Sequence, residues 1–158
     1  MDFAGLVTES ALTFADRLPE GGVLVGVDLG TRTIGLATCD AGWRFATAGT
    51  TLTRGKFARD AAALGELVTA RRAVGIVIGL PRNMDGSEGP RAQASRAYAR
   101  NLAERLSLPV LLWDERWSTV SAETSLIDQG MSRAKRAERI DAHAAAVILQ
   151  GAIDALTR

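Results

Sequence analysis

Three acidic residues lie far apart in the chain, but a folded domain could bring them together. Two of them follow short apolar segments and the third begins an alanine-rich segment. Asp28 ends an apolar run at 23–27, Glu115 follows a second apolar run at 108–113, and Asp141 opens an alanine-rich stretch. Short apolar runs without polar alternation are typical of strands that are covered on both faces. Carboxylates that share one site repel each other unless a multivalent cation compensates, and their hard oxygen atoms favour Mg²⁺ or Mn²⁺.

A three-carboxylate site of this kind predicts metal-dependent hydrolysis. Two divalent ions about 3.5 to 4 Å apart can activate a water molecule and stabilise the leaving oxygen of a phosphodiester. We therefore expect Asp28, Glu115 and Asp141 to be both metal ligands and catalytic residues, holding two Mg²⁺ or Mn²⁺ ions. The alternative is three unrelated surface acids, because a lone Asp-x-Gly such as 28–30 can simply cap a tight turn.

The elements that must position these acids follow from the periodicity of the apolar residues. Three strands in a meander, followed by alternating helices and parallel strands, predict an α/β fold with a mixed five-stranded sheet and helices on both faces. The expected strands cover 23–27, 33–39, 43–50, 74–80 and 108–113. The expected helices cover 3–18, 57–72, 90–107, 119–128 and 140–156.

The last of these helices has to carry its acid to the ends of the strands. We expect the first strand and the strand at 108–113 to be neighbours, so that the acids following them share one edge of the sheet. The helix opens with Asp141, and the spacing predicts that Ala144 and Ala145 face the sheet while Ala142 points away. His143 is then expected on roughly the opposite side, and we exclude it as a ligand.

Length and composition predict one well-cored domain. The 158 residues are 47% hydrophobic and 23% charged, and we expect an N-terminal helical extension and linker at 1–22 followed by one main domain at 23–158. The single cysteine, Cys39, excludes an internal disulfide and any cysteine-rich zinc site. No apolar run has the length of a membrane span and no basic segment precedes a hydrophobic one near residue 1, so we expect a cytoplasmic protein without a membrane partner.

Basic residues gather locally, although the net charge of +1 gives no global attraction to a polyanion. Arg116 flanks the acids and could hold a phosphate bidentately. Arg82 in the turn-rich loop 81–90 and the cluster Arg133, Lys135 and Arg136 could grip a nucleic-acid backbone; the alternative is that both segments are exposed connectors. The helix at 90–107 carries Arg91, Arg96, Arg100 and Arg105, and most of these arginines are expected to be solvated surface.

Four motifs in order carry a resemblance to a known family. They are DLGTRTIGLA from Asp28, GLPRNMDGS from Gly79, WDERWSTVSAE from Trp113 and RIDAHAAAVILQ from Arg139. Together they resemble the YqgF family of pre-16S ribosomal RNA nucleases, which are also described as Holliday-junction-resolvase-like. The resemblance covers 23–156 and implies a ribonuclease H-like fold related to the RuvC-type resolvases. It also carries the family's acidic residues onto Asp28, Glu115 and Asp141, although Trp117 and Ser118 stand where the family commonly has Leu and Thr.

The resemblance implies a metal-dependent endonuclease that processes the 5′ end of pre-16S rRNA in ribosome biogenesis, with precursor rRNA and the small-subunit precursor as partners. A second hypothesis is a resolvase acting on branched DNA, which would require a symmetric dimer. The segment Asp28-Leu-Gly-Thr also resembles the phosphate-binding turn of the actin and Hsp70 ATPases, but those proteins close two such domains around a nucleotide and this chain has room for one. A nucleic-acid-binding module with an idle acidic cluster is a further hypothesis. The substrate, the metal and the oligomeric state stay open at this stage.

Overall fold

A mixed sheet of six strands, in the order β1-β6-β5-β2-β3-β4, organises the chain. The structure is a computed structural model that describes residues 6–117 and 133–157. Its strands are β1 (Val7–Thr8), β2 (Leu24–Leu29), β3 (Thr33–Cys39), β4 (Ala46–Thr53), β5 (Gly75–Leu80) and β6 (Val110–Asp114). Its helices are α1 (Ala11–Asp16), α2 (Phe57–Arg71), α3 (Pro90–Leu106) and α5 (Arg133–Leu156), with a short 3₁₀ turn, η2, at Glu115–Trp117.

The strand directions are those predicted from the sequence. β2, β3 and β4 form an antiparallel meander in which Asp28 lies opposite Gly35, whereas β5 runs parallel to β2 and β6 runs parallel to β5. The Val, Leu and Ile residues of β2, β5 and β6 are all buried, as their uninterrupted apolar runs predict for strands covered on both faces. The α/β class and the mixed sheet are therefore confirmed.

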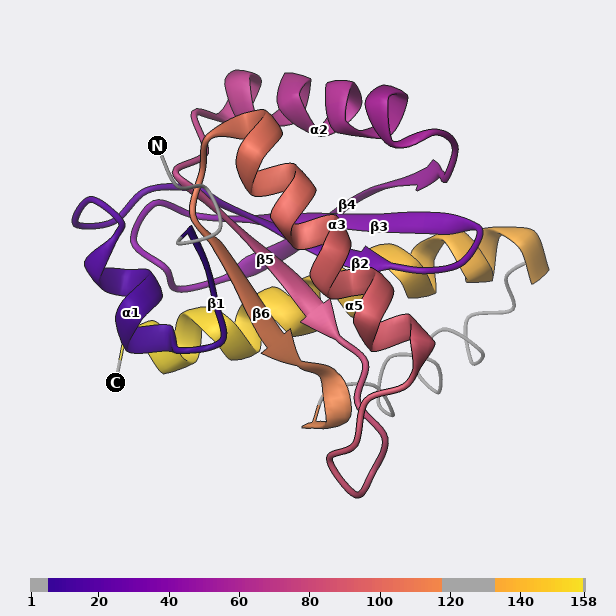
Figure 1. Cartoon of the computed structure of the whole chain (residues 1–158). Helices are drawn as coiled ribbons and strands as arrows, with labels where there is room; N and C mark the ends of the chain where they lie inside the picture. Colours follow the sequence, from indigo (N-terminus) through magenta and orange to yellow (C-terminus); the bar gives the residue numbers. More distant parts are fainter. Residues whose placement is uncertain (1–5, 118–132, 158) are drawn as a thin grey trace.

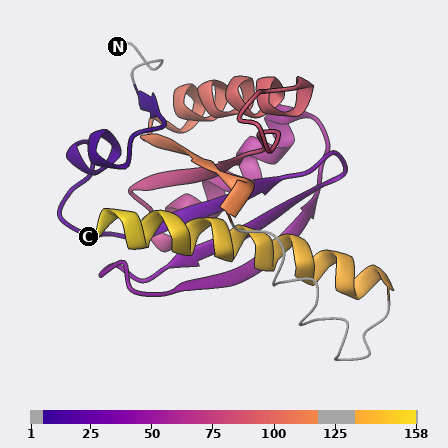
Figure 2. The same ribbon diagram turned by 90° about the horizontal axis from the view of Figure 1, so that it is seen from below.

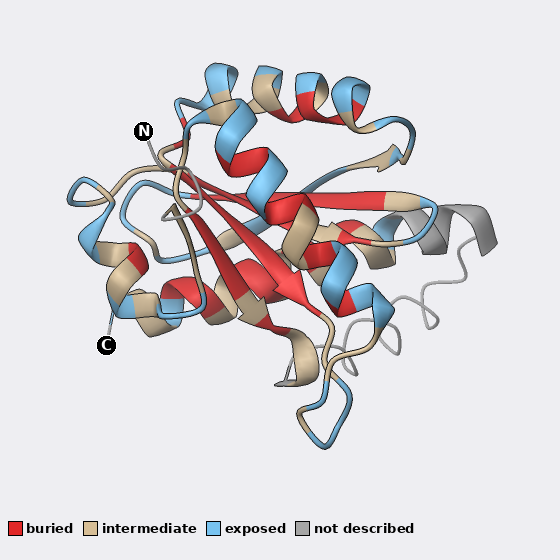
Figure 3. Cartoon of the chain, in the orientation of Figure 1, coloured by how far each residue is buried: buried red, intermediate tan, exposed pale blue. Residues whose placement is uncertain are grey.

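Helices cover the two faces of the sheet in separate layers. α2 and α3 pack on one face, and α5 lies along the other (Figures 1 and 2). Figure 3 shows the buried strands between these layers and the exposed outer sides of α2 and α3. Successive residues of a strand point to opposite faces of the sheet and so pack in different layers. The layer below α2 and α3 contains Val25, Val27, Ile76 and Ile78, and the layer below α5 contains Leu24, Val77 and Leu111.

The long helix α5 lies directly on the backbone of the sheet because glycines leave room for it. A Cβ atom added to Gly26 would lie 2.8 Å from Cβ of Leu149, and one added to Gly35 would collide with the carbonyl oxygen of Asp141. Contacts this close are possible only where a strand has no side chain. Gly26 and Gly35 therefore set the distance between α5 and the strands β2 and β3.

The orientation of α5 differs from the prediction in two respects. The helix begins at Arg133, so Asp141 lies in its third turn and does not open it. Ala142 is only 4% exposed and Ala145 is fully buried, so the expectation that Ala142 points away from the sheet was wrong. The two residues are three positions apart and share a helix face, and Ala144 is half-buried at its margin. His143 is exposed, as predicted.

The N-terminal segment forms more structure than the single helix expected for 3–18. Val7 and Thr8 form β1, a sixth strand that pairs in parallel with β6. Ser10 then caps the short helix α1, its side chain accepting a hydrogen bond from the Thr13 backbone N–H at 3.2 Å. Phe14 is fully buried in the layer between the sheet and α5. The segment is thus packed against the rest of the fold.

The turn before β4 is longer than the sequence predicted. β4 starts at Ala46 and not at 43, because the carboxylate of Asp40 accepts hydrogen bonds from the backbone N–H groups of Gly42, Arg44 and Phe45 and prolongs the turn. The helix predicted at 119–128 lies outside the described residues. None of the helices in the described ranges has the length and apolar character needed to cross a membrane.

Candidate active site

Asp28 and Glu115 meet across an intervening strand. We had expected their strands to be neighbours, and this was wrong, because β5 lies between β2 and β6. The side chains of Asp28 and Glu115 nevertheless share a hydrogen bond. The reason is Gly79 on β5: a Cβ atom there would collide with Oε1 of Glu115 and would lie 2.7 Å from Cδ1 of Ile148. The glycine leaves the surface of β5 open, so Glu115 can reach over it to Asp28.

The two carboxyl groups strongly disfavour being charged together. Burial is the largest cause that raises the pKa of Glu115, and the adjacent Asp28 raises it further, to about 8. Burial also raises the pKa of Asp28, and the charge of Asp141 adds to that effect. Without a cation, the pair therefore holds a proton near neutral pH, with Glu115 donating it to Asp28.

Asp141 approaches this pair from α5 and is held by a hydroxyl group. Its Oδ2 accepts a hydrogen bond of 2.6 Å from Oγ1 of Thr33, the first residue of β3. Thr33 is a residue of the site that the sequence reasoning missed. The available clue was the hairpin: Leu29 pairs with Ile34, so Thr33 must return beside the end of β2. The hydroxyl group fixes the orientation of one carboxylate oxygen of Asp141.

The chemistry of this donor set fits divalent metal ions. Among the described residues, no three His, Cys, Asp or Glu side chains have the spacing of a formed metal site. Asp28 and Glu115 are nevertheless forced to share a proton, and the charge of Asp141 opposes ionisation of Asp28. A hard cation in place of that proton would remove the repulsion, and carboxylate oxygens are the ligands that Mg²⁺ and Mn²⁺ prefer. Asp28, Glu115 and Asp141 are the residues that would hold it.

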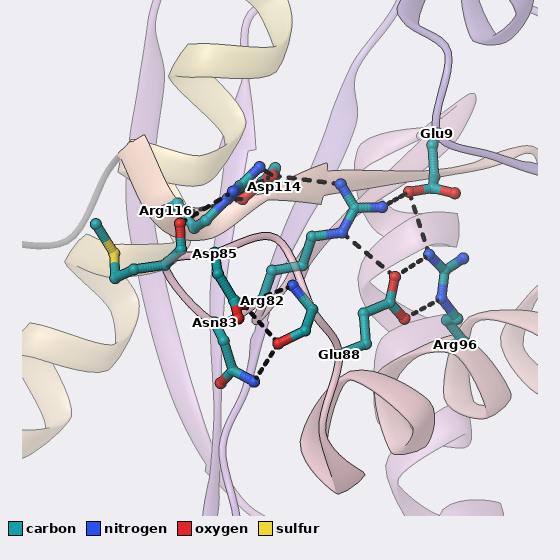
Figure 4. A network of polar contacts seen from close by, with 10 residues as sticks. Glu9, Arg82, Asn83, Asp85, Glu88, Arg96, Asp114 and Arg116 are labelled. Atoms are coloured by element: carbon teal, nitrogen blue, oxygen red, sulfur yellow. Dashed lines mark hydrogen bonds and ion pairs between the residues drawn. The ribbon is translucent and has the colours of Figure 1, made fainter.

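Arg116, one of the arginines predicted to bind substrate, is paired with its neighbour Asp114. Its Nη2 lies 2.7 Å from Oδ2 of Asp114, and its backbone N–H donates to Oδ1 of the same carboxylate at 3.0 Å. Nη1 of Arg82 lies 3.3 Å from Oδ2 of Asp114 (Figure 4). Asp114 itself is only 8% exposed. It therefore has a structural role and anchors both arginines.

Arg82 belongs to a larger ionic network, drawn in Figure 4. It pairs with Glu9 and, at 3.3 Å, with Glu88; Arg96 of α3 also pairs with Glu88, at 2.6 Å, and with Glu9, at 3.2 Å. Arg96, followed by Arg82, lowers the pKa of Glu88 to about 2. The network ties the connection between β1 and α1 to the loop at 81–90 and to α3. The charge of Arg82 is thus already balanced within the protein.

The remaining basic residues predicted to bind substrate lie at the start of α5. The helix includes positions 133, 135 and 136, which were expected in a loop leading to it. The side chains of Arg133, Lys135 and Arg136 lie outside the described residues, as do Ser118 and the side chain of Trp117. Their contribution to binding remains a prediction.

Arg91, one of four helix arginines of which most were expected to be solvated surface, lies beside the acids. Its Nη2 is 3.4 Å from the carbonyl oxygen of Leu29, the residue after Asp28. Its positive charge lowers the pKa of both Asp28 and Glu115, partly opposing the effect of burial. The sequence clue was its place at the second position of a helix that follows the turn-rich loop. Such helix starts lie at the carboxyl ends of the strands in α/β folds.

Comparison with known proteins gives a consistent family assignment. The family profile described as "RuvX: Holliday junction resolvase" matches residues 22–155. A protein of Novosphingobium aromaticivorans is 65% identical over 151 residues, which cover 96% of this chain and 97% of that protein. A protein of Sphingopyxis alaskensis is 60% identical over 153 residues, covering 97% of this chain and 100% of that protein. Both carry the name "Putative pre-16S rRNA nuclease".

A solved structure supports the fold. The structure titled "T. thermophilus RuvC in complex with Holliday junction substrate" aligns with a TM-score of 0.54 and 16% sequence identity. The alignment covers 86% of this chain and 96% of that one. At this identity the likeness concerns the fold, and it confirms the predicted RuvC-like, ribonuclease H-like architecture.

Proposed function

The chain belongs to the RuvX family, and we propose that it is a metal-dependent endonuclease that hydrolyses phosphodiester bonds of precursor 16S rRNA. The observation that carries this proposal is the hydrogen-bonded pair of Asp28 and Glu115 beside Asp141. Two half-buried carboxyl groups in contact have no structural benefit that an apolar pair would lack. They fit a site that exchanges a proton for a divalent cation. An rRNA substrate also implies that the protein works in the cytoplasm, where ribosomes assemble.

The chain's own residues have distinct tasks in this reaction. Asp28 and Glu115, on β2 and at the end of β6, lose their shared proton and present oxygen ligands from one edge of the sheet. Asp141 supplies a third carboxylate from α5, and Thr33 restricts its rotation by donating to Oδ2. When bound there, two Mg²⁺ or Mn²⁺ ions would supply an activated water and charge stabilisation at the leaving oxygen. Gly79 keeps the space above β5 open for Glu115.

The family description supports a second candidate, resolution of branched DNA. The description names Holliday junction resolvases, whereas the relatives at 65% and 60% identity are named for pre-16S rRNA. We favour rRNA because these relatives match almost the whole chain. A junction resolvase must cut two strands symmetrically and therefore needs a dimer.

A substrate panel tests both candidates. The purified protein is incubated with a pre-16S rRNA fragment, a single-stranded DNA of the same sequence and a four-way DNA junction, each with Mg²⁺, Mn²⁺ or EDTA. We expect metal-dependent cleavage of the rRNA fragment. Asp28→Asn, Glu115→Gln and Asp141→Asn should each abolish cleavage, whereas Asp154→Asn, which changes an exposed carboxylate on the same helix as Asp141, should not.

The outcomes separate the hypotheses. Cleavage in EDTA, or full activity of any of the three acid variants, would refute the metal mechanism. Symmetric cleavage of the junction alone would favour the resolvase. Thermal unfolding of each variant shows whether lost activity reflects lost structure. Without metal, we expect the Asp28 and Glu115 variants to be at least as stable as the wild type, because the repulsion between the carboxylates is relieved.

A further inference from the structure

The arginines around the acids fall into two groups. Arg82 and Arg116, on one side, are paired with Glu9, Glu88 and Asp114. Arg54 and Arg91, on the other side, have no carboxylate at ion-pair distance within the described part of the chain. A phosphate approaching Arg82 or Arg116 would have to compete with existing carboxylate partners. A phosphate approaching Arg54 and Arg91 would not.

Arg54 and Arg91 line one small pocket beside the end of β2. The pocket has a volume of about 160 Å³ and is also lined by Leu29, Gly30, Thr31, Pro90, Ala94 and Ser95. A water molecule takes about 30 Å³ of liquid volume and drug-sized ligands occupy about 300 Å³ or more, so this space suits a small group between those sizes. A phosphate group has that size and the charge that two arginines attract.

The two guanidinium groups are held in place by backbone carbonyls and an aromatic ring. Nη1 of Arg54 donates to the carbonyl oxygen of Gly30 at 2.7 Å, and its guanidinium lies 5.5 Å from the ring centroid of Tyr98. Arg91 donates to the carbonyl oxygen of Leu29 at 3.4 Å. Each contact engages one nitrogen and leaves further N–H donors of the guanidinium for a ligand. The two carbonyls belong to consecutive residues, so the pocket is built on the turn that directly follows Asp28.

The pocket is adjacent to the acid pair. Leu29 and Gly30 follow Asp28 immediately in the sequence, and the charge of Arg91 acts on both Asp28 and Glu115. A strand whose reacting phosphodiester lies at the acids would therefore bring a neighbouring backbone phosphate to the pocket. The positive start of α3, where Gly89 provides no side-chain cap, adds to the attraction.

We propose that the pocket between the β2–β3 turn and the start of α3 binds a backbone phosphate of the substrate strand next to the phosphodiester that is cut, with Arg54 and Arg91 as its ligands. This subsite rests on the proposed nuclease function and adds a direction to it. The strand leaves the acids along the β2–β3 turn and α3, and not along the loop that carries Arg82. Because the ligand is a phosphate, the subsite contributes affinity without reading the base sequence.

Arg91→Gln and Arg54→Gln test the subsite, with Arg100→Gln as the matched control. Arg100 is exposed on α3 nine residues after Arg91, on the opposite side of the helix. Binding of a labelled single-stranded pre-16S rRNA fragment is measured by fluorescence anisotropy across a salt series, in a Glu115→Gln background that does not cut. Each pocket variant should weaken binding about tenfold. Each should also reduce the slope of log affinity against log salt by about 0.7. Arg100→Gln should change neither quantity.

A chemical substitution then locates the phosphate. Neutral methylphosphonate linkages are placed one at a time along the fragment, and the loss of affinity is compared with that caused by Arg91→Gln. At one linkage beside the cleavage site the two losses should not add, because both remove the same contact. Additive losses at every linkage would overturn the proposal.

The remaining outcomes separate this proposal from the proposed function. If the wild type cuts the fragment and both pocket variants keep the wild-type salt slope, the subsite is refuted and the nuclease stands. Slower cleavage by Arg91→Gln with unchanged binding would also refute the subsite and would assign Arg91 to the electrostatics of the acids. A wild type that neither binds nor cuts the fragment would refute both. Arg54→Gln also removes the contacts with Gly30 and Tyr98, and it could therefore fail to fold. In that case Arg91→Gln decides the matter, because Arg91 is exposed.

Discussion

Gly35 determines how closely α5 approaches the acids, and Gly35→Ala should therefore impair catalysis. The added Cβ atom would lie well inside 3.0 Å of the carbonyl oxygen of Asp141, a separation that real Cβ atoms essentially never show. Backbone atoms on both sides leave no flexible side chain to yield, so α5 has to move outwards near Asp141. A misplacement of about 1 Å at a catalytic group can cost on the order of 100-fold in rate.

The expected cost in stability is smaller than the expected cost in rate. Overpacking of a well-packed interface typically costs about 1 to 3 kcal/mol, which a domain of this size can tolerate. Gly35→Ala should thus remain folded at 25 °C while losing about 10- to 100-fold in turnover of the rRNA fragment with saturating Mn²⁺. Urea unfolding and single-turnover cleavage, measured on the same preparation, separate the two effects.

Gly26→Ala is the matched control. Its Cβ atom would lie 2.8 Å from Cβ of Leu149 and 2.9 Å from the carbonyl oxygen of Ala145, so it strains the same interface further from Asp141. It should cost similar stability but less turnover. Gly65→Ala in α2, where the added atom meets only the end of the Leu106 side chain, should be neutral or slightly stabilising. Equal turnover losses for Gly35→Ala and Gly26→Ala would refute the argument that Gly35 acts by placing Asp141.

Three other predictions concern the same region. Without metal, the unfolding free energy should fall by roughly 3 kcal/mol between pH 5 and pH 8, because folding raises the pKa of Glu115 from 4.5 to about 8 and the stabilising proton is lost as the pH rises. Urea titrations of the wild type, and a flatter profile for Glu115→Gln, check this. Ala142→Leu and Ala145→Leu should each lower stability by about 1 to 3 kcal/mol in thermal unfolding, since both face the sheet, and tolerance at position 142 would contradict the observed rotation of α5. Asp114→Asn should cost about 1 to 3 kcal/mol by weakening both arginine pairs, whereas the exposed Asp85→Asn should cost less.

The fold was predictable because its strongest signals are local. The apolar runs that became β2, β5 and β6 have no polar interruption, and the helical period of 57–72 contains no proline. The connection lengths then favour a meander followed by parallel crossovers. β1 could not be predicted in this way, because a pair of residues carries no periodicity and its pairing with β6 is set by tertiary contacts.

The site was only partly predictable because its geometry depends on the absence of side chains. The sequence singled out Asp28, Glu115 and Asp141 as acids at the ends of elements. It did not show that Glu115 would cross β5, since that contact depends on Gly79 in a neighbouring strand. The sequence also did not show that Arg82 and Arg116 pair with Asp114, because a linear sequence does not show which side chains meet in the fold; their role in substrate binding stays a prediction.

The consecutive residues Asp114, Glu115 and Arg116 connect the arginine network to the acid cluster. Asp114 is tied to Arg82 and Arg116, so the end of β6 is fixed from outside the acid cluster. Glu115 then leaves the strand at a fixed point and reaches over Gly79 to Asp28. If Arg116 instead served substrate alone, Asp114→Asn would leave cleavage unchanged at saturating substrate. If the ion pairs position Glu115, as the contacts indicate, the same variant should lower turnover even at saturation, and single-turnover kinetics distinguish these results.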